Sequence, residues 1–402
     1  MTLEFRSPTE EDLRATLAAA ETAFGEQLRD DDLERERESI LLDRFVGAYD
    51  AGRPVGVAGS YEFELTIPGG SVPAAGVTWV GVMPSHRRRG VLTEFMRRQL
   101  EDVHARGEPV AILWASEAPI YGRFGYGIAA PSTGLDADRD RLQFRDDSGA
   151  RGTVRLVHRD EARDLVKPIY ERVRRERAGM LSRSDHWWDA HRLEDPEHRR
   201  DGAGPKLYAL LELDGVPEGY AIYRVAPKWE GGFPAGEVRI SESFATSTDA
   251  VRELWRFLAG IDLVTRVKQQ VFDPASPLFL MVVDPRRLRL RLHDGMWLRL
   301  VDVDAALRAR SYAEDGSVVL EVRDEVCPWN DGRYRAGQEP GRTDDEPDAR
   351  LAVADLASAY LGAFRFGRLA AAGRVEELRG GAVERADRLF ATTVPPFCPE
   401  VF

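Results

Sequence analysis

The apolar positions in the first third of the chain change their spacing several times, and each change marks an expected element. A helical spacing of leucine, alanine and phenylalanine predicts a helix over 9–24, and a highly charged helix is expected over 31–40. Apolar runs beside turns rich in glycine and proline predict antiparallel strands. The expected strands are 3–6, 45–49, 55–65 and 72–82. This order is typical of a mixed α/β unit.

The helical spacing returns after Gly90. Leu92, Phe95, Leu100 and Val103 share one face of a helix that is expected to end near residue 107. A short apolar run over 110–115 predicts a buried strand. Together with the strand that ends at 82, these elements predict a strand-loop-helix-strand unit.

A polar segment rich in arginine and aspartate, residues 136–152, is expected to separate this unit from a second one that begins near Val154. The turn at 214–219 echoes the turn at 50–56, and residues 238–245 then correspond to the strand at 72–82. The helix expected over 248–258 corresponds to the helix after Gly90. The linking residues 246–249 contain neither arginine nor glycine, so this copy is expected to lack a phosphate loop. Chance similarity of two hairpins stays open.

The last part of the chain predicts a third unit. Its expected strands are 288–292, 297–301 and 318–322, and its expected helices are 353–361, 369–372 and 386–390. The chain ends in residues 394–402, which include three prolines. Proline lowers the entropy lost when a segment is fixed, so this tail suits an extended path in a groove. A frayed terminus is the alternative.

Composition narrows the class of protein. A chain of 402 residues is too long for one hydrophobic core. It has 43% apolar residues, no apolar run long enough to span a bilayer and no secretory signal, so a soluble protein of the cytoplasm is expected. Cys327 and Cys398 stand alone, which predicts neither a disulfide scaffold nor a metal site. The net charge of -12 disfavours nucleic acid and suits a cationic substrate, although solubility alone explains it as well.

The strongest chemical signal is the stretch from Trp79 to Leu92, in which a strand runs into an arginine-rich loop that opens a helix. Unpaired N–H groups and the positive end of the dipole make a helix N-terminus suitable for a diphosphate. Gly90 lets the backbone approach the phosphates, and the arginines add charge-assisted hydrogen bonds. The alternative is a solvated basic patch, but three arginines oppose the dipole when no anion is bound.

This loop resembles the acetyl-coenzyme A loop of the GNAT acyltransferases, Arg/Gln-x-x-Gly-x-Gly/Ala. Here it reads Arg87-Arg88-Arg89-Gly90-Val91-Leu92, so Leu92 stands where the family has a small residue. With the segment from Ala115 to Gly127, the repeated hairpin and the aromatic C-terminus, the whole chain is similar to the Eis (enhanced intracellular survival) family of aminoglycoside acetyltransferases.

The resemblance implies an α+β chain with two GNAT-type domains in tandem and a C-terminal sterol-carrier-protein-like domain. The implied limits are 1–135 for the catalytic domain, 153–287 for the copy without cofactor and 288–402 for the last domain. It also implies a homo-hexamer that transfers an acetyl group from acetyl-coenzyme A to a small-molecule amine.

The resemblance also implies the site residues. Tyr121 matches the general acid, with Tyr126 as its competitor, and the carboxylate of Phe402 matches the terminal base. Glu400 is a candidate neighbour in an acidic pocket. The residues implied to bind the cofactor are Val80, Gly81, Val82, Arg88, Arg89, Gly90, Val91, Leu92, Thr93, Ser116 and Glu117.

The chemistry agrees with these roles. An amine attacks the thioester as a free base, and a tyrosine with a pKa of about 10 suits protonation of the departing thiolate. An α-carboxylate with a pKa of about 3.5 is a weak base, so we expect it mainly to orient a cationic amine. Acetylation of protein lysines and a non-catalytic lipid-binding or scaffold role are the alternatives. His86 is expected to shape the loop, and Trp187 and Trp188 are expected to belong to the core.

Overall fold

The computed structural model describes residues 3–146 and 152–402, and the chain divides into two compact units. The first unit holds the chain up to Ala130 together with Met296–Pro396 and Glu400–Phe402. The second holds Pro131–Gly295 and Phe397–Pro399. The N-terminal and C-terminal parts of the chain therefore share one unit. Residues 147–151 of the expected polar linker, and the first two residues, lie outside the described residues.

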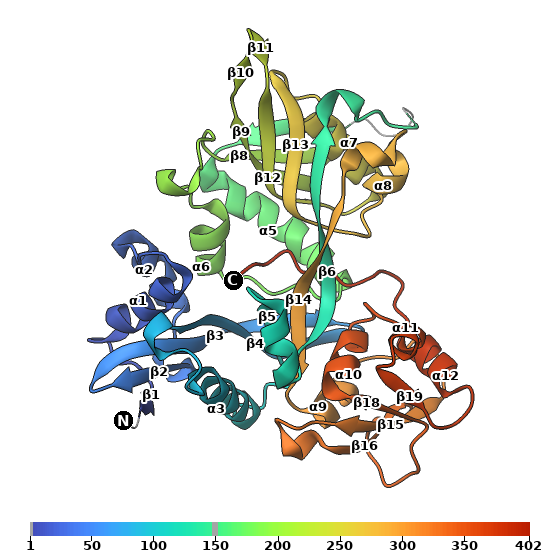
Figure 1. The fold of residues 1–402 in the computed structure, drawn as a ribbon. Helices are drawn as coiled ribbons and strands as arrows, with labels where there is room; N and C mark the ends of the chain where they lie inside the picture. Colours follow the sequence, from blue (N-terminus) through green and yellow to red (C-terminus); the bar gives the residue numbers. More distant parts are fainter. Residues whose placement is uncertain (1–2, 147–151) are drawn as a thin grey trace. The chain divides into compact units, whose positions relative to one another are not determined.

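The N-terminal module of the first unit is a mixed sheet with helices on it (Figure 1). Its strand order is β1 (Glu4–Arg6), β2 (Phe45–Asp50), β3 (Arg53–Ile67), β4 (Gly70–Val82), β5 (Val110–Trp114) and β14 (Arg291–Leu300). Its helices are α1 (Leu13–Phe24), α2 (Asp30–Glu36), α3 (Val91–Ala105) and the single turn α4 (Ala118–Tyr121). The expected elements of this part are confirmed, with the charged helix ending in a 3-10 turn at Arg37–Ser39.

The apolar stripe of α3 explains how the helix docks. Phe95, Met96, Leu100 and Val103 are all at most 1% exposed and share one cluster with the inner face of the sheet. Burying a side chain of this size stabilises the fold by about 1.5–3 kcal/mol. The start of α3, where Gly90 lies, is thereby fixed against the end of β4.

β4 and β5 pair in parallel only over residues 74–76 and 110–112, although β4 runs on to Val82. Beyond that point β4 carries a bulge, because its register with β3 shifts between Val57 and Gly59. Trp79 lies in this bulge with a left-handed φ of 54°. A bulge bends and twists its strand, so the fold opens a wedge between the ends of β4 and β5.

The C-terminal module, in the same unit, has a second sheet of order β17-β16-β15-β18-β19. These strands are β15 (Ser317–Arg323), β16 (Gly332–Gly337), β17 (Gly341–Arg342), β18 (Ala349–Ala352) and β19 (Val375–Glu377). Its helices are α9 (Val303–Ala309), α10 (Val353–Tyr360), α11 (Phe366–Ala371) and α12 (Ala382–Leu389). The strand expected over 318–322 and the three expected helices are confirmed. The strand expected over 297–301 is confirmed as the end of β14, whereas the strand expected over 288–292 is wrong at its start, because Pro285–Leu288 forms a 3-10 turn and β14 begins only at Arg291.

The second unit repeats the strand order of the N-terminal module, since its sheet reads β7-β8-β9-β12-β13-β6. The strands are β7 (Thr153–Val157), β8 (Leu207–Leu213), β9 (Val216–Ala226), β12 (Gly236–Ala245), β13 (Val264–Phe272) and β6 (Gly127–Asp138), which enters from the first unit. Strands β10 (Trp229–Glu230) and β11 (Phe233–Pro234) form a separate ribbon. The helices are α5 (Arg159–Glu176), α6 (Asp185–Trp187), α7 (Thr248–Ala259) and α8 (Leu278–Met281).

The two hairpin turns also agree in backbone geometry. Ala51 and Gly52 have φ values of 50° and 77°, and Asp214 and Gly215 have the same two values. Two consecutive residues with positive φ are typical of the two-residue turn that matches the twist of an antiparallel pair. The internal repeat expected from the sequence is therefore confirmed, and chance similarity is the wrong interpretation.

Candidate active site

A cavity of about 430 Å³ lies in the wedge between β4 and β5. Its walls are the end of β4, the loop into α3, the first turn of α3 and the segment after β5. The predicted cofactor-binding residues that line it are Val80, Gly81, Val82, Arg88, Gly90, Val91, Leu92, Thr93, Ser116 and Glu117. The tertiary structure thus brings together residues from the end of β4, the start of α3 and the segment after β5.

The loop between β4 and α3 presents its backbone to this cavity. Arg88 has a left-handed φ of 61° and Gly90 one of 79°, and Gly90 is the N-cap of α3. Glycine has no side chain with which to cap the helix, so the N–H groups of the first turn stay available to a ligand. A hydrogen-bonded anion at this position is favoured by the helix dipole.

The arginines of the loop divide into two sets. Arg87 and Arg88 line the cavity, and Arg87 donates from Nη2 to the carbonyl of Ala23 at 2.9 Å. Arg89 is the one predicted cofactor residue that is not among the lining residues. Its Nη1 lies 3.9 Å from a carboxylate oxygen of Asp50. An acidic residue of β2 thus lies near this guanidinium but beyond hydrogen-bond distance, and the sequence pattern did not reveal this neighbour.

The cavity also contains residues that the sequence reasoning did not select. They are Ala23, Phe24, His86, Arg87, Ile120 and Arg123. The first two come from the end of α1, which no motif marks. Arg87 lies in the arginine-rich loop and Arg123 in the segment from Ala115 to Gly127. Their positive charge was the signal that would have identified them as phosphate ligands.

His86 stabilises the loop, as expected. Its Nδ1 shares a 2.8 Å hydrogen bond with the Ser85 hydroxyl, and its Nε2 lies 3.1 Å from a carboxylate oxygen of Asp50. Both ring nitrogens are engaged with residues of the protein. This arrangement supports a structural role for His86.

Tyr121 ends the short helix α4 and lines the cavity. Burial raises the pKa of its hydroxyl above the ordinary value, and the negative charge of Glu117 adds to the effect. Tyr126 lies behind it, with ring centroids 6.0 Å apart, and is 1% exposed. Burial raises the pKa of Tyr126 strongly, and Tyr126 is absent from the lining residues of the cavity. The geometry therefore favours Tyr121 over Tyr126.

The C-terminal module holds the turn that carries both tyrosines. Gly125 has a φ of 84°, and a Cβ at this position would lie 2.8 Å from the guanidinium of Arg299. Arg299 is fully buried and donates from Nη2 to both carboxylate oxygens of Asp324, at 2.8 and 2.6 Å. A Cβ at Gly127 would meet the carbonyl of Ala354 in α10 at 2.0 Å. Close packing on the Arg299 side chain of β14 and on the backbone of α10 thus sets the position of the turn.

The tail ends in the same unit as the cavity. The ring of Phe402 packs on Phe63 of β3, and Glu400 is fully buried. Earlier in the tail, the N–H of Phe397 donates to the carbonyl of Ala178 at 2.9 Å. The terminus is therefore docked, and the frayed alternative is wrong.

Comparison with known proteins agrees with this arrangement. Residues 4–129 and 179–300 each match the family model of an acetyltransferase (GNAT) domain, and residues 303–399 match a sterol carrier protein domain. N-acetyltransferase Eis of Mycobacterium tuberculosis is 36% identical over 415 residues, which cover 98% of each chain. The chain belongs to the Eis family of N-acetyltransferases.

Other relatives of this Eis-family enzyme are similar over nearly the whole chain. An uncharacterized N-acetyltransferase of Streptomyces avermitilis is 43% identical over 378 residues, 92% of each chain. The crystal structure of Eis1 from Mycobacterium abscessus covers all of both chains, with a TM-score of 0.86 and 34% identity. The enzyme is thus an acyltransferase that depends on acetyl-coenzyme A.

The second GNAT domain of this Eis-family chain has a different connection into its helix. Ser247 is the N-cap of α7, and its hydroxyl accepts the N–H of Ala250 at 3.2 Å. The protein's own side chain therefore uses one of the donors that a phosphate needs. Trp187 and Trp188 of this domain are 4% and 0% exposed, which confirms their place in the core.

Within residues 3–146 and 152–402, no group of three or more His, Cys, Asp or Glu side chains is arranged to hold a metal ion. In the same residues, every helix is too short or too polar to cross a bilayer.

Proposed function

We propose that this Eis-family enzyme acetylates amino groups of polycationic small molecules of the aminoglycoside type. The observation that carries the proposal is that Tyr121 and the N-terminus of α3 line one cavity. A donor for the departing thiolate and a cradle for the diphosphate thus belong to the same site. Arg87, Arg88 and Arg123 supply positive charge for the phosphates.

In the proposed reaction the amine nitrogen attacks the thioester carbonyl carbon, and the C–S bond breaks as the C–N bond forms. The Tyr121 hydroxyl gives its proton to the sulfur, so coenzyme A leaves as the thiol. The proton that the amine loses restores the tyrosine through solvent. The Tyr121 hydroxyl is protonated at neutral pH, as a general acid must be, and the rise in its pKa on burial disfavours the free phenolate but makes the group a weaker proton donor.

The terminal carboxylate of Phe402 is proposed to orient the cationic amine electrostatically. The docked tail supports this role, because Phe402 packs on Phe63, next to the start of the wedge. A fixed carboxylate attracts an ammonium group without acting as a strong base. The acidic character of the chain is consistent with cationic substrates.

The proposal includes the assembly and the domain limits implied by the family resemblance. These are a cytoplasmic homo-hexamer and domains over 1–135, 153–287 and 288–402. Light scattering of the purified chain, whose mass is 45.0 kDa, tests the assembly directly.

The test of the function is release of the coenzyme A thiol with a panel of amines. Kanamycin, tobramycin, spermidine and a lysine-containing peptide are compared at equal concentration. We expect turnover with the aminoglycosides at least about tenfold above the peptide, a difference of about 1.4 kcal/mol in transition-state stabilisation. Preference for the peptide would point to protein lysine acetylation. Tight binding of acetyl-coenzyme A without thiol release would point to a non-catalytic role.

A further inference from the structure

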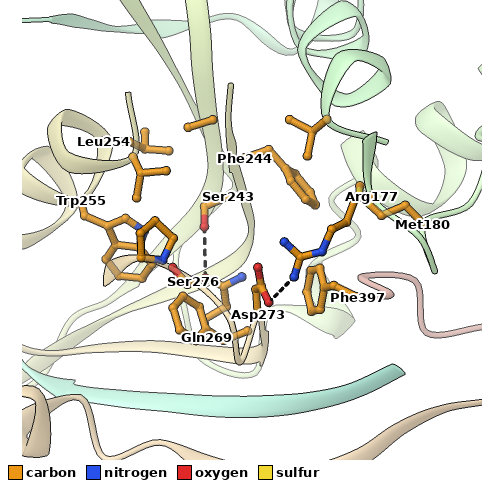
Figure 2. A pocket seen from close by; sticks show the side chains of 15 residues that line it. Arg177, Met180, Ser243, Phe244, Leu254, Trp255, Gln269, Asp273, Ser276 and Phe397 are labelled. Atoms are coloured by element: carbon orange, nitrogen blue, oxygen red, sulfur yellow. Dashed lines mark hydrogen bonds and ion pairs between the residues drawn. The ribbon is translucent and has the colours of Figure 1, made fainter. Parts of the chain in front are cut away.

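The second GNAT domain contains a wedge of its own. Its parallel strands β12 and β13 stay paired as far as Ile240 and Gln269, while β12 runs on to Ala245. A cavity of about 170 Å³ lies there, between the end of β12, α7 and the segment after β13 (Figure 2). It corresponds in topology to the cavity between β4 and β5. The splayed strand pair of the fold therefore creates a cavity in both copies.

This cavity is too small and too differently built for the cofactor. It has less than half the volume of the cavity in the first domain. The Ser243 hydroxyl donates to Oε1 of Gln269 at 3.2 Å, so a hydrogen bond between side chains crosses the wedge (Figure 2). Ser247 caps α7, as described above. A pantetheine arm and a diphosphate have no equivalent site here.

Most of the wall is apolar. Phe244, Leu254, Trp255 and Phe397 line it, and Figure 2 shows Leu254 and Trp255 on one side, with Phe397 opposite. An apolar cavity of about 150 Å³ in a protein core is known to bind benzene. The volume and the aromatic walls therefore suit one ring.

One side of the cavity carries a paired charge. Nη2 of Arg177 lies 2.7 Å from Oδ1 of Asp273, and the same oxygen accepts the N–H of Ala275 at 2.9 Å. Among the residues that the structure describes, Nε of Arg177 is buried without a hydrogen-bond partner. A buried donor without a partner is unfavourable, and a hydrogen-bond acceptor on a ligand would satisfy it.

The pair has no net charge, so it favours a neutral ligand. A bound carboxylate would face Asp273, and a bound ammonium group would face Arg177, at an unfavourable like-charge distance. A hydroxyl group suits both partners, because it accepts from the guanidinium and donates to the carboxylate.

We propose that the cavity of the second GNAT domain is a binding site for a small neutral phenol. The ring occupies the apolar part between Trp255 and Phe397, and the hydroxyl group lies at the Arg177–Asp273 pair. This site is separate from the catalytic cavity and does not depend on the identity of the amine substrate.

Calorimetric titration of the full chain, saturated with coenzyme A to fill the catalytic cavity, tests the proposal. The ligands are p-cresol, toluene and benzoate. We expect p-cresol to bind with a Kd on the order of 1 mM or below, and toluene and benzoate at least about tenfold more weakly. Equal affinities for the three ligands, or no binding of p-cresol, would overturn the proposal.

Two variants locate the site. Arg177→Met removes the donor and should weaken p-cresol at least about tenfold while leaving toluene nearly unchanged. Val251→Phe fills the cavity from α7 and should abolish binding of both. Arg172→Met, on α5 but outside the lining, is the matched control and should bind as the wild type does. Unchanged p-cresol binding in both test variants would mean that the ligand binds elsewhere. If a variant does not fold, the relative affinities of the three ligands for the wild-type protein still test the proposal.

Discussion

The ring of Phe402 packs on the ring of Phe63, with centroids 5.1 Å apart and planes tilted by 52°. Gly76 leaves room for this pair of rings, because a Cβ there would lie 2.4 Å from the Phe63 ring and 3.1 Å from the Phe402 ring. Gly76 is also the last residue of β4 that pairs with β5. The ring of Phe402 therefore lies near Gly76, where β4 separates from β5, but Phe402 is not among the residues that line the catalytic cavity.

Removing this contact should slow turnover while cofactor binding is kept. We expect deletion of Phe402 to lower kcat at least about tenfold, and Phe63→Ala to lower it by a smaller factor, because the carboxylate loses its fixed position. The Kd of acetyl-coenzyme A should change less than about twofold. Thiol release and calorimetry measure the two quantities. Phe63→Leu is the control that keeps an apolar contact, and unchanged turnover after deletion would exclude the terminal carboxylate.

The two tyrosines of the turn should differ in kinetics. Tyr121→Phe removes the proposed acid and should lower kcat about 10²–10⁴-fold at an unchanged fold. Tyr126→Phe removes a buried hydroxyl outside the cavity lining and should lower kcat by less than about threefold. Steady-state rates with tobramycin compare the variants. The reverse order of effects would assign the acid to Tyr126.

The arginines of the loop should also differ in cofactor affinity. Arg87→Ala and Arg88→Ala remove guanidinium groups from the cavity and should each weaken acetyl-coenzyme A about 5–100-fold. Arg89→Ala, whose guanidinium lies near Asp50, should weaken it less than about threefold. Arg97→Ala, a residue of α3 that is paired with Glu94 and Glu101, is the control. An equal loss of acetyl-coenzyme A affinity in Arg89→Ala would contradict the division of the loop arginines into cavity-lining and non-lining residues.

Gly125→Ala should destabilise the turn that carries the tyrosines. The new methyl group would clash with the Arg299 side chain, and the left-handed backbone of residue 125 is unfavourable for alanine. We expect a loss of about 1–3 kcal/mol in the free energy of unfolding, measured by urea denaturation. Gly122→Ala, whose added Cβ meets open space in the helical region, is the control and should cost under about 1 kcal/mol. A stable Gly125→Ala protein would show that the turn adjusts freely.

Lys206 should make the stability depend on pH. Burial, followed by the positive charges of Arg224 and Arg192, lowers its pKa to about 7. Its Nζ donates to the carbonyls of Arg192 and Glu194, both at 2.6 Å. The unfolded chain keeps the ordinary pKa of about 10.4, so between these values it holds a proton that the folded chain has released.

The unfolding free energy of the wild type should therefore rise with pH relative to that of Lys206→Met, by at most about 1.4 kcal/mol per pH unit. Urea denaturation at about pH 7 and about pH 9 measures both proteins. The gain is absent well below pH 7, where both states are protonated. A constant difference between the two proteins would mean that Lys206 keeps an ordinary pKa in the fold.

Local patterns in the sequence were sufficient for most elements of the N-terminal module. The helix after Gly90 was visible because its apolar residues recur at the helical period, and the repeated hairpin because its turn residues recur. The helix α5 was missed, since its mean hydropathy is low and Pro168 lies inside it, where a proline is usually unfavourable. The strand β6 was missed because Pro131, Ser132 and Gly134 interrupt the alternation of apolar and polar residues that predicts a strand.

The sequence by itself determined which chemical groups are available to the site: an arginine-rich loop before a helix, a tyrosine in a glycine-rich turn and an aromatic terminus. Only the tertiary structure decided which of these groups meet. It brought Arg88 and Tyr121 into one cavity, turned Arg89 toward Asp50 and placed Phe402 on Phe63. These choices depend on where β4 separates from β5 and on packing between distant segments, and neither is encoded in the spacing of neighbouring residues.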